Sequence, residues 1–208
     1  MGSSDAAVLT FRPAAKHTRR PDIFDRMTAA HDRLRFLAGA LRLTEDGAPM
    51  QSMRALLIDR LSDALEAHSS AAEQCFYAEL LARSGDEAPA RRAVEAHGEA
   101  AMLVDELSDM ETTGAAWQTA VERLTGLLKA HFTREADEIM ALAKTLLDRE
   151  RALRLGERYD DARRGWIEAF GRQPDPAPAI PAPSLPTPSL PAASEPTTET
   201  RPRRQALA

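Results

Sequence analysis

Several features that would direct a protein to other classes are scarce in this sequence. It has a single cysteine, Cys75, so no internal disulfide can form, which is typical of a protein from a reducing compartment. No apolar run approaches the roughly 20 residues that cross a bilayer, and the stretch from Ala6 to Phe11 is too short for a signal peptide. The 27 Lys and Arg residues, against 32 Asp and Glu, form no large basic cluster. We therefore expect a soluble, cytoplasmic protein that binds neither membranes nor nucleic acid.

Aromatic residues are also few, at 5% of the chain, whereas Ala, Leu, Glu and Arg dominate, a composition that favours helices. Helix-breaking residues gather in short clusters at 44–49, 84–89 and 112–114. These breaks predict helices over about 21–43, 51–82 and 89–110, and a fourth that follows residue 114 and ends near 148. Helices of similar length with short turns indicate an all-α, antiparallel up-down-up-down four-helix bundle. A shorter fifth helix is expected over about 157–170 and should pack across the bundle end. The joint that precedes it is expected at Leu155 and Gly156.

The two ends of the chain differ from this helical part. Residues 1–20 show no periodicity and are expected to form a flexible arm in which His17 is solvated. Residues 173–208 contain ten of the 14 prolines, and this tail should be disordered because it cannot bury enough apolar surface to fold. Its PxxP spacing suits a protein partner with an SH3-like groove, or the tail serves as a linker. The expected domains are 1–20, 21–172 and 173–208.

Polar side chains interrupt the inward stripe of the fourth helix. His131, Glu135 and Glu138 follow its apolar members at steps of three and four, which places all three on one face. A buried carboxylate is costly unless it is paired or bound to a cation. His131 and Glu135, four residues apart, have a spacing typical of metal ligands. Without metal, burial should raise the pKa of Glu135 and leave it protonated or partly hydrated.

Each of the other three helices carries one histidine in the middle of its inward stripe, and these are His31, His68 and His97. Counted at about 1.5 Å per residue from the expected helix ends, the four histidines lie within one or two turns of a common level. Any one of them alone is more simply explained as a hydrogen-bonded core histidine. Because all four coincide with inward positions on separate helices, the set predicts a metal site that includes Glu135.

Four segments carry these histidines in a characteristic order and spacing. They read DIFDRMTAAHDRL, LEAHSSAAEQCFYAEL, AVEAHGEAAMLVDEL and LLKAHFTREADEIMALA. Together they resemble the hemerythrin-like HHE cation-binding domain over about residues 22–150, and GERYDDARRGW is similar to the helix that usually follows. The resemblance implies a four-helix bundle that holds a non-haem iron pair and binds oxygen, nitric oxide or peroxide, or senses or handles iron. It also implies that the four histidines are metal ligands and that Glu135 is a bridging carboxylate.

The sequence departs from the pattern of that family. A second bridging carboxylate is expected four residues after the histidine of the second helix, where Ala72 stands, and Glu73 beside it is a candidate substitute ligand. Ala101 stands where oxygen carriers have a further histidine. Glu138, on the face of Glu135, is a candidate ligand or a hydrogen-bond acceptor behind a ligand. The site is thus expected to be asymmetric, to hold a single metal instead of two, or to bind metal weakly.

The main prediction is a non-haem iron-binding protein, with no catalytic residue assigned, that binds a small diatomic ligand or peroxide. Imidazole-rich ligation also suits zinc, so the choice of iron depends on the resemblance. A catalytic di-iron oxidase is a second class, but such sites use four carboxylates and two Glu-x-x-His motifs, which are missing here. A third is a metal-free bundle with a decayed site that acts as a partner-binding scaffold, which Ala72 and Ala101 would favour.

Overall fold

The computed structural model describes residues 19–44 and 48–171, with the backbone alone for residues 48 and 49, and its regular structure is entirely helical. In chain order the elements are α1 (Ile23–Arg42), α2 (Ala48–Ala71), the π-helical segment η1 (Ala72–Tyr77), α3 (Ala78–Ser84), α4 (Ala88–Asp109), α5 (Gly114–Arg134), the π-helical segment η2 (Glu135–Met140), α6 (Ala141–Leu146) and α7 (Arg149–Phe170).

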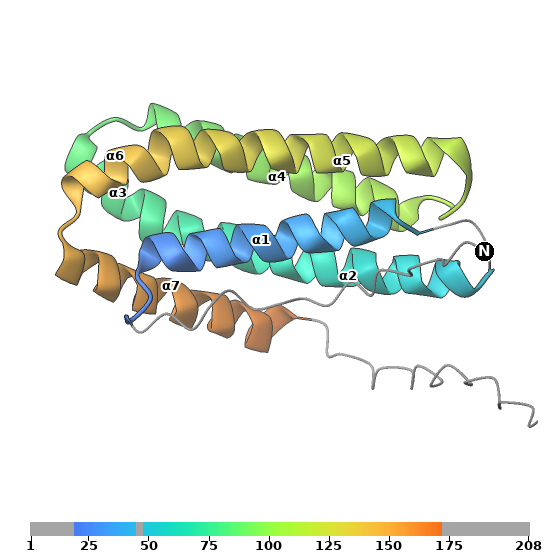
Figure 1. Cartoon of the computed structure of the whole chain (residues 1–208), viewed down its shortest axis with the longest axis horizontal. Coiled ribbons are helices and arrows are strands. Elements are labelled where there is room, and N and C mark those ends of the chain that lie inside the picture. The colour runs from blue at the N-terminus through green and yellow to red at the C-terminus, as the bar shows by residue number, and fades with distance from the viewer. Residues whose placement is uncertain (1–18, 45–47, 172–208) are drawn as a thin grey trace, which may run out of the picture. The chain divides into compact units, whose positions relative to one another are not determined.

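The bundle consists of four helical rods, which are α1, the continuous α2–η1–α3, α4, and the continuous α5–η2–α6 (Figure 1). Helix α1 packs against α2 and α5, and α4 packs against the same two helices, so each rod has two neighbours. This arrangement confirms the predicted all-α helical bundle. No helix within the described ranges is both long and apolar enough to span a membrane.

Local sequence explains where the rods begin and end. The side chain of Asp22 accepts hydrogen bonds from the backbone N–H groups of Phe24 and Asp25, and the Asp25 side chain accepts one from the N–H of Asp22. This reciprocal pair is a capping box, which satisfies N–H groups that the first helical turn leaves free. The second rod ends at Gly85, whose φ of 69° is the left-handed conformation that glycine adopts without strain.

The apolar core forms two clusters with a polar layer between them. In α1, Ala30 belongs to one cluster and Leu34 to the other, and His31 lies between them. Each of the other rods follows the same plan, with residues of the two clusters on either side of its histidine. The flanking pairs are Leu65 and Ala71, Ala93 and Ala100, and Leu128 and Ile139. The four histidines therefore share one level of the bundle.

Helix α7 differs from the predicted fifth helix. It is 22 residues long and passes through Leu155 and Gly156 without a break, and the joint lies before Arg149 instead. It packs along α1 and α2, not across the bundle end (Figure 1). A Cβ atom on Gly156 would lie only 2.9 Å from the backbone C of Asp22 and the backbone N of Ile23. The glycine thus permits close helix packing, and the prediction of a joint there was wrong.

Most of the predicted N-terminal arm, including His17, and the Pro-rich tail over 173–208 with its expected protein partner lie outside the described residues. The predictions made for them remain predictions.

Substitution of Gly156 tests this close contact. Gly156→Ala places a methyl group against the backbone of α1, and overpacking of this kind typically costs about 1–3 kcal/mol. The matched control is Gly165→Ala in the same helix, where an added Cβ has no heavy atom within 4 Å. That change should stabilise the protein by about 0.5–1 kcal/mol, because alanine has the higher helix propensity. Urea unfolding measures both variants, and equal effects would contradict the contact.

Candidate metal site

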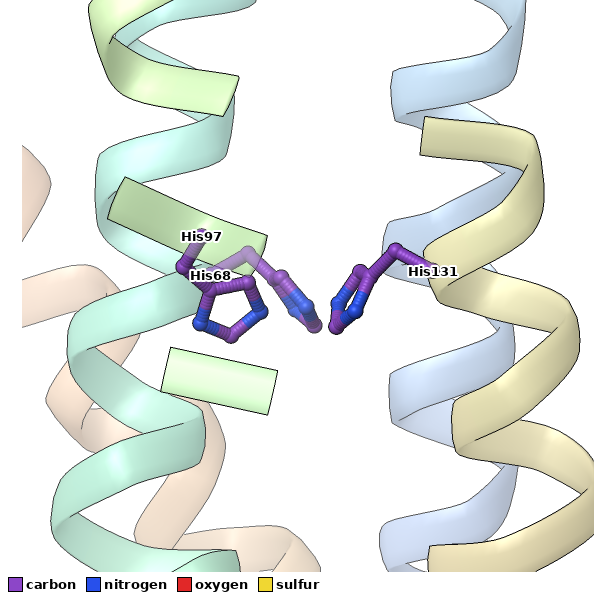
Figure 2. Close-up of side chains that lie close together, drawn as sticks. All are labelled: His68, His97 and His131. Atoms are coloured by element: carbon purple, nitrogen blue, oxygen red, sulfur yellow. The ribbon is translucent and has the colours of Figure 1, made fainter. Parts of the chain in front are cut away.

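The polar layer consists of His31 from α1, His68 from α2, His97 from α4, His131 from α5 and Glu135, the first residue of η2. Each of these side chains is at most 4% exposed. The rings of His68, His97 and His131 approach one another in the space between the rods (Figure 2). Ring centroids are 4.9 Å apart for His31 and His68, 5.3 Å for His68 and His97, and 4.7 Å for His97 and His131. The structure thus gathers the five residues that the sequence pattern selected.

The atoms that face the centre of the layer are potential metal donors. The Nε2 atoms of all four histidines and Oε2 of Glu135 are buried and have no hydrogen-bond partner. Oε2 of Glu135 lies 3.0 Å from Nε2 of His31 and 3.5 Å from Nε2 of His131, which are ion-pair distances. A buried polar atom that lacks a hydrogen bond costs about 1–3 kcal/mol. Five such atoms at one place indicate a site built for a ligand that accepts their lone pairs.

These donors form two groups within the described residues. One group is His68, His97 and His131, and the other is His31, His68 and Glu135. Within each group one donor atom per residue lies within 4.8 Å of the others. Ligands bonded at about 2.0–2.2 Å on opposite sides of one ion are about 4.0–4.4 Å apart, so either group can close around an ion with small shifts. His68 belongs to both groups.

Two of the histidines contact a partner through the ring nitrogen that faces away from the centre. Nδ1 of His68 lies 2.7 Å from the hydroxyl oxygen of Tyr159 in α7. Nδ1 of His97 makes a longer contact of 3.4 Å with Oε1 of Glu73. Partners of this kind fix the orientation and the tautomer of a ligating imidazole. The side chain of Glu73 is 39% exposed and points at the back of His97, outside both donor groups.

Glu135 is fixed by a tyrosine. The hydroxyl of Tyr77 in η1 donates a hydrogen bond of 2.8 Å to Oε1 of Glu135, which leaves Oε2 to face the histidines. Burial and the negative charge of Glu135 raise the pKa of the Tyr77 hydroxyl well above its ordinary value. The phenol therefore remains a hydrogen-bond donor at every physiological pH.

Burial favours the neutral form of two of these imidazoles, those of His68 and His131. It is the main cause that lowers the pKa of His68 well below its ordinary value, with repulsion from His31 in addition. Burial and repulsion from His97 lower the pKa of His131 to about 4. A neutral imidazole carries the lone pair that binds a metal. These two histidines can therefore bind a metal at pH 7 without first releasing a proton.

The carboxyl group of Glu135 behaves differently from the sequence-based expectation. Burial does raise its pKa, but the imidazole of His31 at 3.0 Å and the neighbouring His68 and His131 outweigh burial and lower the pKa to about 2. The expectation that burial would raise the pKa and leave Glu135 protonated without metal was wrong, and the alternative of a partly hydrated carboxylate stays a prediction. The expectation about the pKa considered burial alone, whereas the surrounding imidazoles and Tyr77 stabilise the anion.

The π-helical segments explain where the remaining predicted residues lie. Both begin four residues after a histidine, η1 at Ala72 after His68 and η2 at Glu135 after His131. A π-turn inserts one extra residue, which shifts the following face by about 100°. Glu138, predicted to face inward beside Glu135, is therefore turned to the surface.

At the surface the side chain of Glu138 is 46% exposed and accepts a hydrogen bond of 2.7 Å from Arg92. Ile139 takes the inward position in its place. Glu138 lies outside both donor groups, as does Glu73.

The same shift brings Tyr77 into the site. It lies nine residues after His68, which in a regular α-helix would place it on the opposite face, about 180° away. The extra residue of η1 reduces this angle to about 80°, and Tyr77 reaches Glu135. Sequence periodicity gave no sign of this. Tyr159 was not selected either, because a helix placed across the bundle end could not reach His68.

Comparison with known proteins agrees with this geometry. The model of the family described as Hemerythrin HHE cation binding domain matches residues 12–143, which is more than half of the chain and includes all five residues of the polar layer. No curated protein and no solved structure matches the chain. The chain belongs to the hemerythrin HHE cation-binding domain family.

Proposed function

We propose that this protein binds non-haem iron in the polar layer and uses it to bind oxygen, nitric oxide or peroxide, or to handle iron. Membership of a cation-binding family supports a metal at this place. The observation that carries the proposal is the convergence of five buried donor atoms, four Nε2 atoms and one carboxylate oxygen, without hydrogen-bond partners.

The donor set is compatible with iron. Imidazole nitrogen together with a carboxylate oxygen suits iron and also zinc, and the hemerythrin family match is the reason to prefer iron. Bound iron would supply a centre that changes between Fe(II) and Fe(III) and accepts a small ligand at an open coordination position. We assign no residue of this chain a catalytic role.

The protein residues have separable roles in this proposal. The histidines His31, His68, His97 and His131 would hold the metal through Nε2. Glu135 would add a negative charge that balances the cation, and Tyr77 would restrict that carboxylate to one free oxygen. The two apolar clusters above and below the layer would exclude bulk water from the bound ligand.

The geometry supports one or two irons in unequal positions. The two donor groups share His68, and a single nitrogen lone pair binds one ion at a time. Ala72, which is fully buried, offers no oxygen at the place that corresponds to Glu135 on the other π-helical rod. Two irons would therefore need further ligands such as water, whereas one iron can be held by either group.

The competing proposal is a decayed site in a metal-free scaffold. The packing of Ala101 against one apolar cluster agrees with it. However, replacing a buried polar cluster with apolar residues is often neutral or stabilising, so a chain that no longer binds metal has no reason to retain five converging donors. Iron analysis of protein purified without chelator distinguishes the two proposals.

Metal should stabilise the fold. We expect one or two irons per chain after anaerobic reconstitution with Fe(II), and a higher melting temperature than that of the metal-free protein. A ligand that binds only the native state contributes about 2.7 kcal/mol at a hundredfold excess over Kd. Metal analysis with calorimetry before and after chelation checks this. An unchanged melting curve after confirmed metal loss would count against the proposal.

Two glutamates in one π-helical segment provide a matched pair of variants. Glu135→Gln keeps the size of a buried side chain but removes its charge, and we expect iron affinity to fall at least tenfold. Glu138→Gln changes an exposed side chain outside both donor groups and should leave iron affinity within about twofold. Anaerobic titration against a coloured chelator measures both. Equal losses would instead make Glu138 a ligand.

A further inference from the structure

A contact behind His68 connects the site to a helix beyond the family match. The match ends at residue 143, yet the partner of His68 Nδ1 is Tyr159 of α7, at 2.7 Å. Both side chains are completely buried, so water cannot replace this contact. The site therefore uses a residue from outside the four-helix bundle.

We propose that Tyr159 is a positioning residue that holds the His68 imidazole in the tautomer whose Nε2 lone pair faces the metal. The inference rests on the proposed metal site. A neutral imidazole has one proton, so a lone pair on Nε2 requires the proton to be on Nδ1. The oxygen of Tyr159 is the acceptor for that Nδ1–H group, and ligating histidines commonly donate their second N–H in this way.

His68 is the histidine for which such control matters most, because it belongs to both donor groups. A proton on its Nε2 would remove one ligand from each group. Helix α7 is held where it can supply the tyrosine by Gly156, which lies one turn before Tyr159 and touches the start of α1. The close packing of α7 at Gly156 thus brings the hydroxyl of Tyr159 within reach of His68.

Removal of the hydroxyl should change the tautomer. In Tyr159→Phe the Nδ1–H group of His68 would lose its acceptor. The population of the tautomer with the proton on Nε2, on the side of Glu135, would then increase. We expect the apparent affinity for Fe(II) to fall about 10–100-fold, which is the usual effect of losing such a partner.

Nitrogen-15 NMR of the metal-free protein measures the tautomer directly and requires no iron. We expect His68 of the parent to carry its proton on Nδ1 and Tyr159→Phe to move the proton toward Nε2. The control is Leu155→Ala, which truncates a buried α7 side chain and lowers stability through a cavity but retains the hydroxyl. Its His68 signals should match those of the parent.

The outcomes separate this inference from the proposed function. A parent with the proton on Nε2, or a Tyr159→Phe variant with unchanged His68 signals, overturns the role of Tyr159, and the parent measurement decides even if the variant fails to fold. Unchanged Fe(II) affinity in Tyr159→Phe also overturns it. A parent that binds no Fe(II) but shows the expected tautomer shift rejects the proposed function and retains the tyrosine contact.

Two cavities lie beside the polar layer. A cavity of about 260 Å³ beside α4 is lined by Arg92, His131 and Arg134. A second cavity of about 10 Å³, which is about the space of one water, is lined by the same three residues and by Glu135 and Glu138. The larger cavity lies between α4 and α5, and the smaller one marks an opening between α4 and η2 where surface residues meet buried residues of the site.

Aromatic side chains cover two other histidines of the layer. The ring of His31 stacks on Phe132 at 4.1 Å between centroids, and Tyr159 of α7 covers His68. The geometry points to the opening between α4 and η2 as the path to the site, with the Arg92–Glu138 ion pair as its closure. Nη2 of Arg92 lies 2.7 Å from Oε2 of Glu138. Both side chains are partly exposed, and a surface ion pair of this kind breaks readily.

Two substitutions that alter charge in opposite directions test the closure. Arg92→Ala and Glu138→Gln should each raise the rate of His131 acylation by diethyl pyrocarbonate in metal-free protein, and the rate of Fe(II) uptake, about 1.5–5-fold, as expected for a weak surface pair. Arg91→Ala is the control, because Arg91 pairs with Glu87, just before α4, and with Glu95 on α4, and it lines neither cavity.

Peptide mass spectrometry and stopped-flow absorbance measure the two rates. If the two variants change uptake in opposite directions, charge alone controls entry and the closure is rejected. Rates equal to those of the parent in both variants, or an equal increase in Arg91→Ala, also overturn it.

Discussion

The ionised carboxylate of Glu135 in the middle of the bundle is the constraint around which the site is arranged. A bare anion at this depth would be expelled or protonated. Instead His31 lies within ion-pair distance of one oxygen and Tyr77 donates to the other. These partners come from two further rods, so the charge holds three of the four rods at one level. The same layer divides the apolar core into two clusters, and a shift of any rod along its axis would separate donors that must meet.

Sequence periodicity predicted the parts of this arrangement that depend on regular helices. One histidine on each inward stripe, with Glu135 one turn after His131, was enough to select the polar layer, since up to those residues each rod is a regular α-helix. The pattern failed after the layer, where η1 and η2 each add one residue to a turn. Glu138 turns outward, and Ile139 takes its place. Nothing in the composition of these segments distinguishes a π-turn from an α-turn, and the contact that the π-turn of η1 permits, between Tyr77 and Glu135, spans two rods.

Glycine shows a second limit of local reasoning. Gly156 has the sequence context of a break, yet the helix runs through it because a side chain there would strike the backbone of α1. Whether a glycine breaks a helix or permits a close contact depends here on the start of α1, which lies some 130 residues earlier in the chain. Tyr159 was missed for the same reason. Its contact with His68 depends on the short distance between α7 and the bundle, which Gly156 permits.

The two π-helical rods are alike in backbone and unequal in chemistry. Each has a histidine four residues before its π-segment, but the first residue of η2 is Glu135 and the first residue of η1 is Ala72. The group of His31, His68 and Glu135 therefore includes a carboxylate, whereas His68, His97 and His131 offer imidazole nitrogens alone. In a buried site of low dielectric, attraction to an anion offsets much more of the desolvation cost of a divalent cation than neutral donors do. Under the proposed function, the charge balance would thus favour the Glu135 group for the first ion. A second ion could not also bind His68 and would depend on His97 and His131 with ligands from solvent.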